Sequence, residues 1–290
     1  MSDKIVRAMA LNGNVRIFVA KTTNLVQRAH ELHGTYPAAS AALGRTLSIG
    51  AIMGTTLKND DEKLVIEIRG DGELGQILVN ADNKGFVRGL VSNPYVHKVN
   101  SIGKLDVGGS IGHGTLRVTH DVLDGMAFSS QVELQSGEIG DDFAYYYAQS
   151  EQIPSAVSVG VLVNEDLSIK SAGAILIQVL PSATEEDISE IEKTLAQLPP
   201  VSNLMIDQEA VEVCANLFND VLILETTDTQ YYCGCNKEQM TDVLRTLSTD
   251  ELKELIAEDQ GAVLECHYCH SKYTFDEAAL REIISERQKN

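Results

Sequence analysis

The 290-residue sequence has few basic side chains and no long apolar run. It contains 23 Lys and Arg against 42 Asp and Glu, which gives a net charge of −19. Because phosphate backbones are bound by surplus Lys and Arg, this balance argues against nucleic acid as a partner. No apolar run reaches the length needed to cross a bilayer, so we also expect no membrane partner.

Targeting signals and unusual composition are also absent. Residues 1–18 have neither the apolar stretch nor the small-residue cleavage site of a signal peptide, so we expect a cytoplasmic protein. Hydrophobic residues make up 43% of the chain and charged residues 22%, which is typical of a folded protein and not of a disordered one. A chain of this length can bury a large core and form two or three domains.

The sequence also lacks a recognisable catalytic constellation. We find no Ser-His-Asp set and no pair of carboxylates that the pattern assigns to one site. The glycine cluster at 108–114 matches neither the P-loop nor the dinucleotide-binding motif, so we interpret it as a flexible turn. We therefore expect that the protein is not an enzyme.

Residues 1–180 have the pattern of an α+β domain. Short segments with alternating apolar and polar residues, as half-buried strands require, are separated by Gly, Asn and Asp turns. The expected strands are 15–19, 64–70, 76–80, 86–91, 115–119, 131–134 and 172–180, and the expected helices are 24–33, 38–56 and 141–152. Because the strands are joined by short connections, we expect an antiparallel sheet.

A change of composition marks residues 181–230, which carry eleven acidic residues and a single basic one. Ser182 and Glu185 form a predicted capping box for a helix that must end before Pro199. A second amphipathic helix is expected after Asp207. Each helix is short and the like charges repel one another, so we expect an acidic helical linker that folds only against another surface.

Residues 231–290 have the pattern of a small third domain. Helix caps are predicted at Ser248 and Thr274, and the apolar segment 262–265 is a predicted strand. A domain of this size is below the roughly 70–80 residues at which an apolar core usually suffices. It therefore needs a cross-link.

Four of the five cysteines lie in this last segment, as Cys233-Gly-Cys235 and Cys266-His-Tyr-Cys269, with thirty residues between the two pairs. In a reducing cytoplasm such spacing is typical of a metal site or a redox site. Four thiolates can surround one zinc ion as a tetrahedron. We predict that these cysteines bind one Zn²⁺ per chain, and the same thiolates can be oxidised to disulfides.

Three other histidine and cysteine residues are assigned simpler roles. His267 and His270 flank the second cysteine pair, but a full set of four thiolates leaves no position for them on a metal. We expect them either at the surface or in contact with the cysteine ligands without binding the metal. Cys214 lies on the apolar stripe of the second linker helix, so we expect a buried thiol that acts as a small hydrophobic side chain.

Two other functions remain open for a chain with these motifs. A zinc ribbon of a transcription or RNA-binding factor needs a basic face, whereas residues 231–290 carry twelve acidic and seven basic residues. A thiol–disulfide oxidoreductase usually has its CxxC at the start of a helix in a thioredoxin-like pattern. Here the CxxC follows a predicted strand. Turnover in an insulin-reduction assay would favour the oxidoreductase, and no turnover would favour a redox switch.

The motif order resembles a known family. A CxC pair, about thirty residues and a CxxC pair at the end of an acidic chain of this length are similar to the heat shock protein thirty-three family, the redox-regulated 33 kDa chaperonins. The resemblance covers the whole chain and implies a chaperone that needs no ATP, a holdase. It implies that Cys233, Cys235, Cys266 and Cys269 bind zinc in the reduced, inactive state. It also implies that the active state has the disulfides Cys233–Cys235 and Cys266–Cys269.

The resemblance further implies a stress-response role with several partners. Unfolding proteins would be the clients under oxidative and heat stress, the active form would be a homodimer, and clients would pass to the ATP-dependent seventy-kilodalton chaperone system. Unfolding of the linker would be a second trigger. We expect the reduced state to keep the linker helices on apolar surface of the N-terminal sheet domain.

Overall fold

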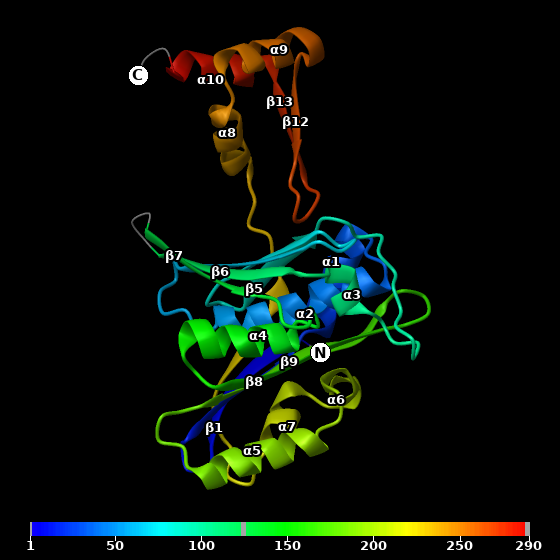
Figure 1. Cartoon of the computed structure of the whole chain (residues 1–290). Helices are drawn as coiled ribbons and strands as arrows, with labels where there is room; N and C mark the ends of the chain where they lie inside the picture. The colour runs from blue at the N-terminus through cyan, green and yellow to red at the C-terminus, as the bar shows by residue number, and fades with distance from the viewer. Residues whose placement is uncertain (1, 123–125, 288–290) are drawn as a thin grey trace. The chain divides into compact units, whose positions relative to one another are not determined.

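The computed structural model describes residues 2–122 and 126–287 and divides into two compact units, Met1–Tyr232 and Cys233–Asn290 (Figure 1). The larger unit contains two mainly antiparallel sheets with helices. The smaller unit contains helices and one hairpin, and it holds the four clustered cysteines. The predicted α+β class is confirmed.

The first sheet has five strands, and each neighbouring pair is antiparallel. Its order is β10 (Leu222–Asp228), β1 (Lys4–Ala10), β2 (Val15–Lys21), β9 (Ile169–Val179) and β8 (Ser155–Val163). Both faces of its central strands are buried: Ile5 and Phe18 lie in one apolar cluster, whereas Val6 and Ile17 lie in another. Helices therefore cover both sides of this sheet.

The second sheet has six strands. Its order is β11 (Gln230–Tyr231), β5 (Phe86–Val91), β4 (Gln76–Ala81), β3 (Lys63–Gly70), β6 (Gly114–Val122) and β7 (Met126–Glu133). Only the pair β11–β5 is parallel among the described strands. The expected strands correspond to β2–β7 and β9, whereas β1, β8, β10 and β11 were not predicted.

Helix α2 (Pro37–Gly54) lies between the two sheets, and nearly all of its residues are buried (Figure 1). Proline at its first position suits a helix start. Helix α1 (Thr23–His33) packs beside it and ends at Gly34, whose φ of 60° is the left-handed conformation that favours glycine. Both helices were predicted, which confirms the apolar pattern of this part of the chain.

Two further segments complete the central core. The predicted helix at 141–152 is confirmed as α4 (Gly140–Tyr146), which continues into the wider turn η1 (Tyr147–Glu151). The glycine cluster is not simply a flexible turn. It contains the short helix α3 (Val107–Ile111), where the Asp106 side chain accepts a hydrogen bond from the backbone N–H of Gly109. This aspartate cap was overlooked in the sequence.

Three helices cover the other face of the first sheet: α5 (Glu185–Gln197), α6 (Val201–Asp207) and α7 (Ala210–Ala215) (Figure 1). The predicted capping box was misplaced. Thr184 caps α5 together with Asp187, whereas the Ser182 hydroxyl donates to the side-chain oxygen of Asn14. Helix α6 and strand β10 were not expected within the linker. Short elements of this kind depend on the sheet beside them for their stability.

The smaller unit has three helices and a hairpin: α8 (Lys237–Thr246), α9 (Thr249–Asp259), β12 (Gly261–Glu265), β13 (Lys272–Asp276) and α10 (Glu277–Arg287). The Ser248 cap is confirmed. The predicted cap at Thr274 is wrong, because Thr274 lies in β13 and Asp276 accepts the hydrogen bond from the Ala279 N–H. No helix of the described residues is long and apolar enough to span a membrane.

Candidate metal centre and the covered sheet face

The first cysteine pair lies in a segment between β11 and α8 that has no regular structure. Asn236 follows Cys235 directly and caps α8, with its side chain accepting from the backbone N–H of Gln239. This cap ends the extended segment one residue after the pair. The first pair therefore lies directly before the start of α8, in a segment without regular structure.

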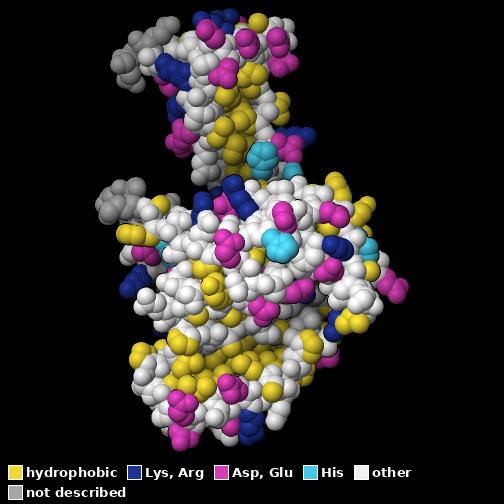
Figure 2. Space-filling view, viewed as in Figure 1, with side chains coloured by type: hydrophobic (Ala, Val, Ile, Leu, Met, Phe, Trp, Pro, Cys, Tyr) yellow, Lys and Arg dark blue, Asp and Glu magenta, His cyan; other side chains and the backbone are white. Residues whose placement is uncertain are grey.

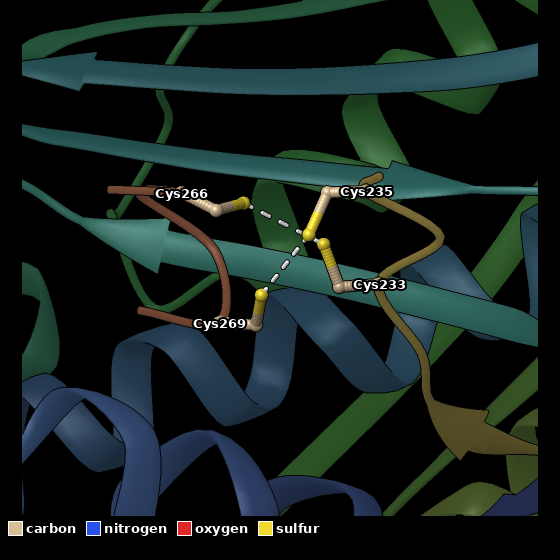
Figure 3. Close-up of side chains that lie close together, drawn as sticks. All are labelled: Cys233, Cys235, Cys266 and Cys269. Carbon is tan, nitrogen blue, oxygen red and sulfur yellow. Dashed lines mark hydrogen bonds between the residues drawn. The ribbon is translucent and has the colours of Figure 1, made fainter. Parts of the chain in front are cut away.

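The second pair lies in the turn between β12 and β13. Two backbone hydrogen bonds close this turn: Cys266 N–H donates to Ser271 at 3.0 Å, and His270 N–H donates to Cys266 at 2.8 Å. His270 has a positive φ of 58°, which the tight turn requires. The turn places Cys266 and Cys269 on the side that receives the first pair (Figure 3).

The four sulfur atoms all lie within 4.8 Å of one another (Figure 3). The Sγ atoms of Cys233 and Cys266 are 3.7 Å apart, and those of Cys235 and Cys269 are 3.3 Å apart. A zinc ion with four thiolates at about 2.3 Å requires sulfur–sulfur separations of about 3.8 Å. The four cysteines therefore fit the metal that their spacing predicts.

Hydrogen bonds and burial give the thiols different acidities. Burial raises the pKa of Cys235 to about 12, although the Tyr273 hydroxyl acts in the opposite direction. Burial also raises the pKa of Cys266. It acts in the same direction on Cys269, but hydrogen bonds from the side chain and backbone of Ser271 and from the Cys235 and Cys233 thiols together outweigh it and lower that pKa to about 6. In the absence of metal, Cys269 therefore ionises more readily than Cys235 or Cys266.

The flanking histidines are not part of the cluster. Within the described residues, the four cysteines form the one group of His, Cys, Asp or Glu side chains close enough to bind a metal ion. His270 Nδ1 instead lies 2.7 Å from Glu265 Oε1, and His267 is exposed. Sequence reasoning missed Ser271 and Tyr273, whose hydroxyls lie beside the sulfurs. Their only signal was their position directly after the second pair.

The fifth cysteine lies in the larger unit, on the face of α7 that packs against the first sheet. Cys214 is fully buried in the apolar cluster between the first sheet and helices α5–α7, and this burial raises its pKa to about 12. Its assignment as a small buried hydrophobic side chain is confirmed.

We call the surface beneath these helices the covered sheet face. Its buried sheet residues are Val6, Ala8, Ala10, Val15, Ile17, Val19, Ile175 and Ile177. The helices bury against them Ile191, Val201, Met205, Ala210, Val213, Cys214, Leu217 and Phe218. Figure 2 shows apolar side chains gathered between the sheet and the helices. Removal of the helices would expose a continuous apolar surface.

Polar contacts also fasten the helices to this sheet. The turn between β1 and β2 bonds to both ends of the segment: Asp220 accepts from the backbone of Leu11 and Asn12, and the Asn14 side chain donates to Asp187. Between these ends, Lys21 Nζ lies 2.8 Å from a carboxylate oxygen of Glu209. Such contacts are weaker than apolar burial but fix the register of the helices on the sheet.

Comparison with known proteins agrees with these features. A family model described as Hsp33 protein matches residues 3–276. The chain is 46% identical to the 33 kDa chaperonin of Staphylococcus carnosus, with 98% of each chain covered. It is 43% identical to the 33 kDa chaperonin of Bacillus subtilis, with 96% of this chain and 97% of the relative covered.

A solved structure agrees as well. The crystal structure of the 33 kDa chaperonin of Thermotoga maritima, a heat shock protein 33 homolog, matches all of this chain with a TM-score of 0.92 and 33% sequence identity, and all of that chain is covered. The sequence relatives and this structure carry the same name. The chain therefore belongs to the Hsp33 protein family and is a chaperone of the Hsp33 type.

Proposed function

We propose that this protein is a redox-regulated, ATP-independent holdase that binds unfolding proteins under oxidative and heat stress. It is inactive while the thiols of Cys233, Cys235, Cys266 and Cys269 are reduced and bind one Zn²⁺. The observation that carries this proposal is the convergence of all four sulfurs within 4.8 Å, from two motifs separated by thirty residues. Each motif contains two neighbouring cysteines that can also react with each other.

In the reduced state, the four thiolates would bind the ion, which supplies a cross-link between the first cysteine pair and the β12–β13 hairpin. Closing a loop of this size restricts the unfolded chain by roughly 3–4 kcal/mol. Among the described residues of the smaller unit, the apolar core has five buried side chains, and its other members are only partly buried: Leu244, Leu252, Phe275, Leu280 and Ile283 are the buried ones. We infer that a core of this size does not keep the unit folded without the cross-link.

Oxidation changes this cross-link. A thiolate attacks hydrogen peroxide to form a sulfenic acid, and the neighbouring thiol displaces water to form the disulfide. Each pair loses two electrons and two protons, and the peroxide is reduced to two water molecules. The disulfides Cys233–Cys235 and Cys266–Cys269 would each close only a short loop. Because disulfide sulfurs no longer act as thiolate ligands, the strong cross-link would be exchanged for two weak ones.

The linker responds to this loss through the chain itself. Tyr232, whose ring centroid lies 4.6 Å from that of Phe86, directly precedes Cys233. Strands β11 and β10 precede Tyr232, and α7 lies before β10. We infer that fraying of the smaller unit spreads backwards along these elements. The covered sheet face and the released linker would then bind clients through apolar contacts that need no particular sequence.

The remaining features of the proposal follow the family. Residues 1–180 would form the chaperone and dimerisation domain, residues 181–230 the linker, and residues 231–290 the redox-switch zinc domain. The protein would act in the cytoplasm, form a homodimer when active, and pass clients to an ATP-dependent chaperone. The net charge of −19 would keep the loaded complex soluble. We assign no catalytic residues.

The proposal is tested by replacing Cys233 and Cys235 together by Ser, with Cys214→Ala, which removes a thiol without burying a hydroxyl, as the control. The double variant is expected to lose zinc and to suppress aggregation of a heat-unfolded test protein without added oxidant. The control is expected to keep one zinc per chain and to stay inactive until oxidised. A double variant that keeps its full zinc content and stays inactive would contradict the proposal. Turnover in an insulin-reduction assay would favour an oxidoreductase instead.

A further inference from the structure

The side chain of Tyr273 joins the hairpin that carries the second cysteine pair to the first pair, and it is not itself one of the four metal ligands. It lies in β13 opposite Leu264, and its ring packs against the apolar core of the smaller unit. Its hydroxyl lies 2.9 Å from the carbonyl oxygen of Cys235 and 3.2 Å from the Cys235 sulfur. The hydroxyl thus reaches a segment that lies 38 residues away in the sequence.

Ser271 provides a contrast within the same turn. Its hydroxyl lies 3.3 Å from the sulfur of Cys269, only two residues away. That contact is local and belongs to the turn of the second motif. The Tyr273 contact instead joins the hairpin to the first motif, where no helix or strand fixes the backbone of Cys233 and Cys235. Of these two hydroxyls, only that of Tyr273 restrains the position of the first pair.

We propose that the Tyr273 hydroxyl positions the Cys233-Gly-Cys235 segment and slows its oxidation. The inference deepens the proposed function and rests on it, because it names a residue that sets the oxidant sensitivity of the same cysteines. A thiolate accepts hydrogen bonds and has no proton to donate, so in the reduced, metal-binding state the tyrosine is the donor. The hydroxyl lies within hydrogen-bond distance of both acceptors, the Cys235 carbonyl oxygen and the Cys235 sulfur.

The chemistry predicts that this hydrogen bond slows the first step of oxidation. When the Cys235 thiolate attacks peroxide, an S–O bond forms, the O–O bond breaks, and hydroxide leaves with the electron pair of that bond. The Cys233 thiolate then forms the S–S bond and displaces a second hydroxide. The negative charge leaves the Cys235 sulfur in the first step, so a hydrogen bond to that sulfur stabilises the reactant more than the transition state. Its removal speeds the reaction.

The matching variant is Tyr273→Phe, which keeps the ring in the core and removes the hydroxyl. The control is Tyr232→Phe, which removes a half-exposed tyrosine hydroxyl one residue before Cys233 and keeps the ring contact with Phe86. Both purified reduced proteins are treated with peroxide while a chromogenic chelator reports zinc release. Alkylation and peptide mass mapping report which pair has formed its disulfide at each time.

Loss of one net hydrogen bond predicts that Tyr273→Phe releases zinc roughly 2- to 10-fold faster than wild type. Mass mapping is expected to show the Cys233–Cys235 disulfide forming earlier relative to Cys266–Cys269. The Tyr232→Phe control is expected to match wild type in both. Equal release rates for Tyr273→Phe and the control, with the same order of disulfides, would overturn the inference.

Two further comparisons make the test decisive. If reduced Tyr273→Phe binds zinc too weakly for a release rate to be measured, alkylation and mass mapping follow oxidation of both proteins in the zinc-free reduced state: faster formation of the Cys233–Cys235 disulfide than in the control supports the inference, and equal rates overturn it. If wild type releases zinc without gaining holdase activity, the proposed function fails. The ratio of the two release rates still decides the role of Tyr273.

Discussion

Asp220 accepts a hydrogen bond of 2.8 Å from the backbone N–H of Asn12, so the end of the α5–α7 segment is fastened to the turn between β1 and β2. A second bond of 2.9 Å comes from the N–H of Leu11. These two donors lower the pKa of Asp220. Leu11 and Asn12, which donate these bonds, both have positive φ angles, so the carboxylate binds the tightest part of the turn.

Asp220→Ala should loosen the helices over the covered sheet face. Removing an acceptor from two backbone donors predicts linker opening that is about fivefold more frequent at a given temperature. The alkylation rate of Cys214, buried between α7 and the first sheet, measures this opening. Asp207→Ala, which removes an exposed acidic residue of the same linker, is the control and should leave the rate unchanged. Equal rates in the two variants would show that the turn does not restrain the linker.

Cys214 is also expected to report activation in the wild-type chain. Burial raises its pKa to about 12 and excludes alkylating reagents, so the reduced protein should label slowly. Peroxide at raised temperature should speed labelling at least tenfold as holdase activity appears. Mass mapping separates this labelling from that of the other four cysteines. Full holdase activity with Cys214 still protected would mean that clients bind elsewhere than on the covered sheet face.

Asp3 predicts a pH dependence of the larger unit. Its carboxylate is buried and accepts from the Leu25 N–H and the Asn24 side chain. Burial outweighs these bonds and raises its pKa from 3.8 to about 6. Because the folded pKa is the higher one, the contribution of Asp3 to stability is fully present below pH 3.8 and is lost as the pH rises through about 6.

Asp3→Asn removes this ionisation. Between pH 4 and pH 7, wild type should lose about 2 kcal/mol of unfolding free energy relative to the variant, since each pKa unit corresponds to about 1.4 kcal/mol and part of the effect is already lost at pH 4. Urea unfolding of both proteins at several pH values measures the difference in unfolding free energy. The contributions of the other carboxylates are the same in both proteins and cancel in this difference. Parallel stability curves for the two proteins would contradict the raised pKa.

Gly44 permits the close contact between α2 and its neighbours. A Cβ atom at this position would lie 2.5 Å from Cγ1 of Val26 and 2.9 Å from Cγ2 of Val161. Gly44→Ala should therefore destabilise the larger unit by roughly 1–3 kcal/mol through overpacking. A more stable Gly44→Ala protein would contradict this packing.

The expectations from sequence succeeded where local chemistry dominates. Helix α2 follows from a long apolar segment with Pro37 at its start, and the Ser248 cap follows from its spacing to Glu251. The grouping of the four cysteines followed from their spacing, although their role as zinc ligands stays a prediction. Such features depend on residues a few positions apart, which a sequence displays directly.

The missed features depend on contacts between distant segments. Strand β10 pairs with β1 across more than two hundred residues, and nothing in the local pattern of residues 222–228 distinguishes it from a linker. Ser182 is not the cap because α5 begins after Thr184, and the capping partner of Thr184, Asp187, also accepts from the distant Asn14 side chain. Tyr273 is a typical strand residue until the fold brings Cys235 to its hydroxyl. Tertiary partners of this kind cannot be derived from periodicity.

The central claim is that loss of the metal cross-link releases chaperone activity. Its most direct test follows zinc release with a chromogenic chelator during peroxide treatment at raised temperature, together with suppression of aggregation of a heat-unfolded protein. The account predicts that about one zinc per chain leaves as the four thiols are oxidised, that holdase activity rises with the same time course, and that a thiol reductant with added zinc reverses both. Complete zinc release with no gain of holdase activity would contradict it.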